Sequence, residues 1–261
     1  LATQLVSKIQ TELQADVPLK DIYGNPTVGK LAALVDLLRS AGTVSSEIPP
    51  AAGRTSYPLT PSQRTMWMLH QSDRSGILSN IPEVIYLNGP LNVDVMEQAF
   101  NEVIRRHDSL RMVYSMEKGE MVQRPLAKVY VPVKLTDLSG LDAAERDRRA
   151  AEMRRTNGLH VFDLSTGPLI HAELVKLAPN RFQLFFNIHH IAADGWGISR
   201  FTTEFAELYE AFLDRRPSPL PPPGLQYSDV AVWIDERIRS GALQSQLDYW
   251  KDRLAAPRPD L

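Results

Sequence analysis

The strongest constraint on the fold of this chain is a break in its hydrophobic pattern at residues 43–58. Ser, Pro, Ala and Gly dominate this segment, and its apolar residues follow neither the helical nor the strand period. Such a composition is typical of a linker. Residues 1–42 are too few for an independent core, whereas residues 59–261 suffice for one large domain. We therefore expect a small partial domain, a linker over 43–58 and a larger domain.

The first 42 residues predict two or three helices. Leu5, Ile9 and Leu13 recur every four residues, and a second apolar stripe runs from Val28 to Leu38. Thr27 is a candidate N-cap for the second stripe, and Gly42 is a candidate stop signal.

From residue 59 onward, helical and extended patterns alternate. Helices are expected from Pro61, from Asp94, over 143–157, after Gly195 and twice more before Leu261, and strands over 110–114, 128–135, 169–177 and 181–188. Asp94 is the candidate N-cap of its helix, with Glu97 at the capping-box position. This order predicts a mixed α/β (α+β) fold.

Composition excludes several classes of protein. A net charge of −2 argues against a general nucleic-acid binder, which would show a basic field. No apolar run approaches the roughly 18 residues of a membrane span, and charged residues interrupt the N-terminus where a signal peptide would be apolar. The cytosol is therefore the expected compartment. The chain has no cysteine, which removes disulfides and thiolate chemistry.

One constellation carries candidate chemistry. The strand predicted over 181–188 ends in His189 and His190, and Asp194 and Gly195 follow at the start of a helix. A histidine, with an unperturbed pKa of about 6.5, can exchange protons near neutrality. Asp194 is placed as an N-cap or as the partner of an arginine, and the Gly195 amide is a candidate donor to developing negative charge. The alternative is that the histidine pair is only structural; a metal site is not favoured, because adjacent strand residues point to opposite faces.

These residues resemble the HHxxxDG motif of the condensation-domain superfamily of nonribosomal peptide synthetases, which is structurally similar to chloramphenicol acetyltransferase. Three further segments resemble the family's other motifs in the family's order: 60–69, 106–114 and 227–233. The second departs from RHExLRTxF by Asp108 and Met112, and the third departs from YxDFAVW by Val230. The resemblance implies an N-terminal lobe of the chloramphenicol-acetyltransferase type over 59–235, with 236–261 beginning the crossover to a second lobe.

The first 42 residues resemble the helices that follow the phosphopantetheine serine of a peptidyl carrier protein. The resemblance places that serine upstream of Leu1, and the sequence around Ser7 does not fit the attachment motif. The cofactor it implies is phosphopantetheine on carrier proteins, with no metal. The partners it implies are upstream and downstream carriers and the adenylation domain of the module, with no nucleic acid and no membrane.

The resemblance implies amide bond formation between a carrier-tethered acyl thioester and a carrier-tethered amine. His190 is then the catalytic residue, His189 is structural, and Asp194 holds the loop through an arginine. Arg106 and Arg111 are the candidates for that arginine within this chain, although it could also come from the second lobe. Trp196 and Gly197 after the motif are more similar to the type that joins two L-configured residues.

Two alternatives stay open. One is a free-standing acyltransferase that uses coenzyme A thioesters, which the carrier-like N-terminus argues against. The other is a non-catalytic lobe that binds carriers as a platform; enzymatic activity of the chain by itself is left undecided.

Overall fold

The computed structural model describes residues 2–40, 48–51 and 53–255, which form two compact units divided after Ile48. The smaller unit holds α1 (Ala2–Leu13), α2 (Leu19–Gly24) and α3 (Val28–Ser40) around Ile9, Ala15, Val17 and Val35. The Thr27 hydroxyl accepts from the Lys30 amide at 3.4 Å, which confirms Thr27 as the cap of α3. The candidate stop signal at Gly42 lies outside the described residues.

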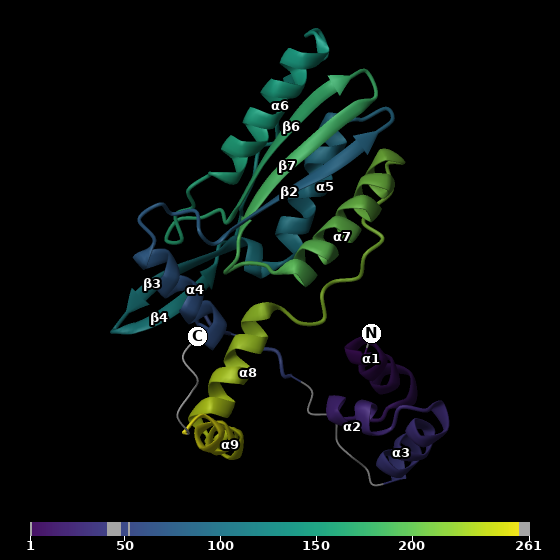
Figure 1. Cartoon of the computed structure of the whole chain (residues 1–261), viewed down its shortest axis with the longest axis vertical. Coiled ribbons are helices and arrows are strands. Elements are labelled where there is room, and N and C mark those ends of the chain that lie inside the picture. The colour runs from purple at the N-terminus through teal and green to yellow at the C-terminus, as the bar shows by residue number, and fades with distance from the viewer. Residues whose placement is uncertain (1, 41–47, 52, 256–261) are drawn as a thin grey trace. The chain divides into compact units, whose positions relative to one another are not determined.

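A four-stranded sheet forms the centre of the larger unit (Figure 1). Its order is β2 (Asn80–Asn88), β7 (Arg181–His189), β6 (Ile170–Ala178) and β5 (Lys134–Asp137). The pairs β2–β7 and β6–β7 are antiparallel, and β5 runs parallel to β6.

Helices cover both faces of this sheet. Alternation along β7 sends Leu184, Phe186 and Ile188 into the main core with α5 (Val93–Arg106) and α7 (Gly195–Leu213), where Phe100, Phe201 and Phe205 pack. Phe185 faces the other way, against Ala150 and Met153 of α6 (Ala143–Gly158). Figure 1 shows α5 and α7 together on one side of the sheet and α6 on the other.

A second sheet, ordered β1 (Tyr57–Pro58), β4 (Glu120–Pro125) and β3 (Met112–Glu117), lies next to α4 (Pro61–Ser72) and α8 (Tyr227–Arg239) in Figure 1. The 3₁₀ helix η1 (Asp108–Arg111) connects α5 to β3, and α9 (Gln244–Leu254) follows α8. The predicted mixed α/β class is confirmed.

Four local predictions need correction. Residues 49–58 of the predicted linker belong to the larger unit, while 43–47 and 52 lie outside the described residues. The segment 128–135 is mostly irregular, with strand only from Lys134. Helix α5 begins at Val93 with Asn92 as its N-cap, because the Asn92 side chain accepts from the Val95 amide. Glu97 caps nothing and instead accepts from Tyr130 and from the Val133 amide.

Candidate functional site

The end of β7 turns one histidine inward and the next outward. His189 is fully buried on the same face of β7 as Phe185 and Asn187, with its ring against His70 (5.1 Å between centroids) and Phe162 (6.1 Å). Its Nδ1 accepts from the Ile191 amide at 3.1 Å, so the hydrogen of the neutral ring is at Nε2. Burial, and then the nearby His70 and His190, lower the pKa of His189 to about 4. The ring is therefore neutral at physiological pH and shapes the turn.

His190 is exposed and begins the loop that leads to α7. Its amide donates to the Ser79 carbonyl at 2.7 Å, next to the first pair of the β2–β7 ladder. This bond extends the sheet by one residue and fixes the point from which the side chain leaves. The sequence did not single out Ser79, because its contribution is a backbone carbonyl.

His190 lines a cavity of about 420 Å³. Residues from all four motif segments meet there, and the lining comprises Ser62, Gln63, Met66, Ser109, His190, Ile191, Ala192, Ala193, Asp194, Gly197 and Tyr227. Ser62, Ser109 and Tyr227, which carry hydroxyls, and the apolar Met66 line this cavity together with His190. The cavity thus combines a proton acceptor with groups that can hydrogen-bond a polar substrate.

Asp194 is the N-cap of α7. Its carboxylate accepts from the Gly197 amide at 2.9 Å, and its carbonyl accepts from the Ile198 amide. Gly197 is where the chain is tight, since a Cβ there would lie 3.2 Å from the Ala193 Cβ. At Gly195, by contrast, a Cβ would meet no heavy atom within 4 Å. The Gly195 amide remains exposed at the first helical position.

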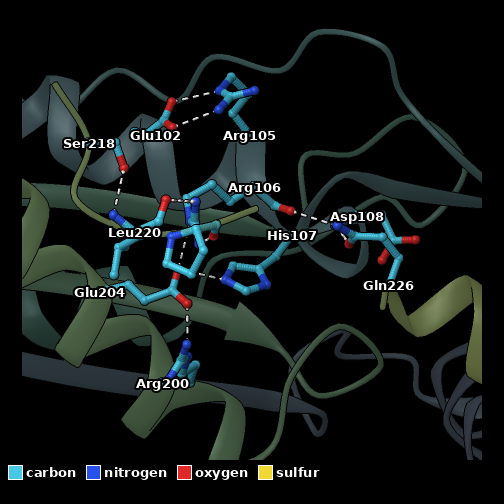
Figure 2. Close-up of polar contacts among 11 residues, drawn as sticks. Glu102, Arg105, Arg106, His107, Asp108, Arg200, Glu204, Ser218, Leu220 and Gln226 are labelled. Carbon is cyan, nitrogen blue, oxygen red and sulfur yellow. Dashed lines mark hydrogen bonds and ion pairs between the residues drawn. The ribbon is translucent and has the colours of Figure 1, made fainter. Parts of the chain in front are cut away.

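Neither candidate arginine reaches Asp194 in the described residues, which corrects that expectation. Arg106 is buried and pairs with Glu204, with Nε 3.0 Å from Oε2 (Figure 2). Arg111 Nη1 donates to the Leu126 carbonyl at 2.6 Å, while the Leu126 amide donates to the Arg111 carbonyl. The two arginines of the second motif therefore hold the lobe together rather than contacting Asp194.

The motif segments 106–114 and 227–233 are joined by buried hydrogen bonds. The Asp108 carboxylate accepts from the Ser228 hydroxyl and from the Tyr227 amide at 3.3 Å. The Gln226 side chain bridges the Asp108 amide and the Arg106 carbonyl, each at 2.9 Å (Figure 2). These bonds place the start of α8, and with it Tyr227, at the edge of the cavity.

Behind the cavity, Gln63 of α4 is buried and fully engaged. Its Oε1 accepts from the Thr60 amide, completing a capping box, and its Nε2 donates to Tyr114 and Gln123. The first motif is therefore fastened to the β3–β4 hairpin.

A larger groove of about 570 Å³ lies between α6 and the far end of the sheet, lined in part by Tyr86, Arg154 and Arg181. It lacks a histidine, and none of the four motif segments contributes to its lining. We therefore assign the candidate site to the cavity at His190. Among the described residues, no three His, Asp or Glu side chains gather as a metal site, and no helix has the length and apolar character to cross a membrane.

Comparison with known proteins agrees with the motifs. The family model described as the condensation domain matches residues 53–261, and that of the phosphopantetheine attachment site matches residues 1–35. The chain is 35% identical over 260 residues to tyrocidine synthase 3 of Brevibacillus parabrevis, and 39% identical over 229 residues to chondramide synthase of Chondromyces crocatus. These alignments cover 100% and 85% of this chain, but only 4% and 6% of the two relatives.

The fold is similar to the crystal structure of the starter condensation domain of rhizomide synthetase. The TM-score is 0.70 at 24% identity, with 79% of this chain and 49% of that chain covered. The match to the condensation-domain model includes the HHxxxDG loop, the residues that line the cavity and the three other motif segments. This chain therefore belongs to the condensation-domain family, with part of a phosphopantetheine-type carrier domain preceding it.

Proposed function

We propose that the lobe containing His190 catalyses amide bond formation between a carrier-tethered acyl thioester and a carrier-tethered amine. The observation that carries this proposal is the position of His190: an exposed imidazole at the end of a strand, lining a cavity to which the HHxxxDG loop and the three other motif segments contribute. The two relatives are peptide synthetases, but the chain spans only 4% and 6% of their lengths. Their activity is therefore proposed for the protein that contains this chain.

The reaction requires the amine nitrogen to attack the thioester carbonyl carbon. The carbon–sulfur bond breaks, the electron pair leaves with sulfur, and the nitrogen loses one proton. His190 is placed to accept that proton or to hold the amine in line by a hydrogen bond. A thioester is already activated, so we rank positioning above base catalysis: proximity can contribute about 7 kcal/mol or more, against about 10²–10⁴-fold for a general base.

The remaining groups have supporting roles in this proposal. The Asp194 cap sets the start of α7, so that the exposed Gly195 amide is available to the carbonyl oxygen as its charge develops. His189 shapes the turn from inside the lobe.

The phosphopantetheine arm is treated as part of the substrate. It would supply the thioester, and Ser7 is not proposed as its attachment site, because the sequence around Ser7 does not fit the attachment motif. We also propose that residues 59–235 form the catalytic-motif lobe and that residues 236–261 begin the crossover to the second lobe. The proposed partners are carriers and an adenylation domain, the proposed location is the cytoplasm, and the proposed reaction joins two L-configured residues.

The experiment that tests the substrate class compares two donors with one acceptor. Protein extended through the second lobe is given an acceptor-loaded carrier and either a donor-loaded carrier or the same acyl group on coenzyme A, and the product is weighed by intact-protein mass spectrometry. We expect transfer from the carrier to be faster at equal concentration. Equal or faster transfer from coenzyme A would favour the free-standing acyltransferase, and no transfer from either would favour a binding platform.

A further inference from the structure

A buried carboxylate with two arginines and one histidine as hydrogen-bond partners lies behind the HHxxxDG loop. Glu204, in the third turn of α7, is 1% exposed. Its Oε2 accepts from Arg106 Nε at 3.0 Å and lies 2.9 Å from His107 Nε2, and its Oε1 accepts from Arg200 Nε at 2.8 Å (Figure 2).

This carboxylate is ionised in the folded protein. Burial alone would raise the pKa of Glu204, but hydrogen bonds from His107 and Arg106 outweigh it and lower the pKa below its ordinary value. Because an ionised carboxylate only accepts hydrogen bonds, His107 Nε2 carries the hydrogen in this contact. The network therefore joins the end of α5 to α7 through charge-assisted bonds, which are stronger than neutral ones.

The same network reaches the other side of the cavity. Arg106 uses its remaining donors on the carbonyls of Pro221 (2.7 Å) and Leu220 (3.4 Å), in the segment that leads to α8. The Arg106 carbonyl accepts from Gln226, and Tyr227, the next residue, lines the cavity. Glu204 thus connects, through Arg106, the helix that starts at the loop with the segment that delivers Tyr227.

Arg200 and His107 also lie directly behind the loop. Together with Ala193 and Gly197 they line a second small cavity of about 80 Å³. Ala193 and Gly197 line the His190 cavity as well, so they form a thin partition between the network and the candidate site.

We propose that Glu204 is a positioning residue that fixes the distance between the two walls of the cavity, the HHxxxDG loop on one side and Tyr227 on the other. The consequence for turnover rests on the proposed function, whereas the consequence for the geometry does not. Without the charge on Glu204, the bond from Arg106 to α7 is weakened, while Arg106 still binds the carbonyls of Leu220 and Pro221. The HHxxxDG loop at the start of α7 is then free to shift relative to Tyr227. A misplacement of about 1 Å can reduce a rate about 100-fold.

The test compares Glu204→Gln with Glu102→Gln in the full chain. Glu102 is the matched control: it also forms a two-bond pair with an arginine, Arg105, but this arginine is exposed and Glu102 is only partly buried (Figure 2). Backbone amide signals in ¹H–¹⁵N spectra report the geometry. We expect the signals of residues 193–197 and of Tyr227 to shift or broaden in Glu204→Gln only, while those of the β3–β4 hairpin stay in place.

Turnover is then measured in protein extended through the second lobe and corrected for the folded fraction. We expect kcat to fall about tenfold or more in Glu204→Gln, with KM for both carriers unchanged and with substantial recovery in Glu204→Asp. A purely structural role would lower the folded fraction without changing kcat per folded molecule.

If Glu204→Gln does not fold, His107→Phe takes its place, because it keeps a ring at this half-buried position and removes one bond to Oε2. The same amide signals should then move. The proposal is overturned if the 193–197 and Tyr227 signals match wild type in the folded variant, or if they move and kcat falls in His190→Ala but not in Glu204→Gln. If His190→Ala and Glu204→Gln both transfer as fast as wild type while the signals still move in Glu204→Gln, the proposed function is refuted. The role of Glu204 in the geometry of the cavity walls then still stands.

Discussion

At the scale of single residues, Asp194 shows how one motif position can be interpreted in two ways. A carboxylate there can cap a helix or pair with an arginine, and within the described residues it caps α7 through the Gly197 amide. The two roles differ in what they require of the side chain: a cap needs an acceptor oxygen, whereas an ion pair needs the charge.

This difference gives a prediction for Asp194. We expect Asp194→Asn to keep the free energy of unfolding within about 0.5 kcal/mol of wild type, because Asn caps as well as Asp, and Asp194→Ala to cost about 1 kcal/mol. Urea denaturation of the full chain measures both. An Asn variant as unstable as the Ala variant would show that the charge is needed, and would return the arginine to consideration.

His189 and His190 are neighbours with opposite surroundings, and the strand period explains why. Successive residues of a strand point to opposite faces, so His189 is buried whereas His190 is exposed. The His189 ring accepts a hydrogen bond from the Ile191 amide in the turn, and His190 lines the cavity. The motif predicted the pair; the aromatic neighbours of His189, which are His70 and Phe162, come from α4 and from the segment after α6, and no local pattern indicates them.

At the scale of elements, hydrogen bonds join the motif segments to one another and to neighbouring strands. Gln63 ties α4 to β3 and β4, and Asp108 ties η1 to α8. Each bond is made between residues far apart in sequence, so each motif depends on the others for its position.

Gln63 provides the element-scale prediction. Gln63→Leu leaves the buried Thr60 amide without its acceptor and removes one bond to Tyr114 and the bonds to Gln123. Tyr114 and Gln123 keep their bonds to the carbonyls of Ile191 and Pro58, and we expect a loss of about 1–3 kcal/mol in the free energy of unfolding. Thr65→Ala, an exposed change on the same helix, should stay within about 0.5 kcal/mol. Thermal or urea denaturation checks the pair, and a Leu variant as stable as the control would contradict the role given to this network.

The elements also show where prediction from sequence ends. The strand pair 169–177 and 181–188, the helix 143–157 and the motif turn were predicted to within one or two residues, because period and turn residues are local signals. Strand β2 was missed: Pro82 lies inside it, and proline argues against a strand unless that strand is at an edge, which is where β2 lies.

The contacts of the candidate site residues could not be predicted from the sequence. Glu97 has the spacing of a capping box but bonds to a distant segment instead, and Arg106 meets Glu204 rather than Asp194. In both cases the side chain bonds to a residue far away in the sequence rather than to the partner that the local pattern or the resemblance predicted. Glu204 itself is one of several charged residues in α7, and sequence alone does not indicate that it is buried.

At the scale of the whole molecule, partly and fully buried histidines make stability depend on pH. The pKa values of His189, His160 and His171 are all lowered, mainly by burial, so the unfolded chain binds protons that the folded protein does not. These histidines lower the free energy of unfolding only below pH about 6.5, where the unfolded chain begins to bind their protons, and the loss grows as the pH falls. For His189, with a folded pKa of about 4, the full loss reaches about 3 kcal/mol.

We therefore expect the free energy of unfolding of the larger unit to fall between pH 6.5 and 5, and His189→Asn to reduce that slope by up to about 1.4 kcal/mol per pH unit. Tryptophan fluorescence follows this unit alone, because all four tryptophans lie in it. An unchanged slope in the variant would show that His189 is protonated as readily in the folded protein as in the unfolded chain.

The proposed role of His190 in transfer between carriers is tested most directly by the mass of the acceptor. An acceptor-loaded carrier is incubated with donor-loaded protein extended through the second lobe, carrying either His190 or His190→Ala, and is then weighed by intact-protein mass spectrometry. We predict that the acceptor gains the mass of the donor with His190, and that the rate falls at least about 100-fold in the Ala variant. Equal transfer by both proteins would show that His190 is dispensable and that the proposed mechanism is wrong.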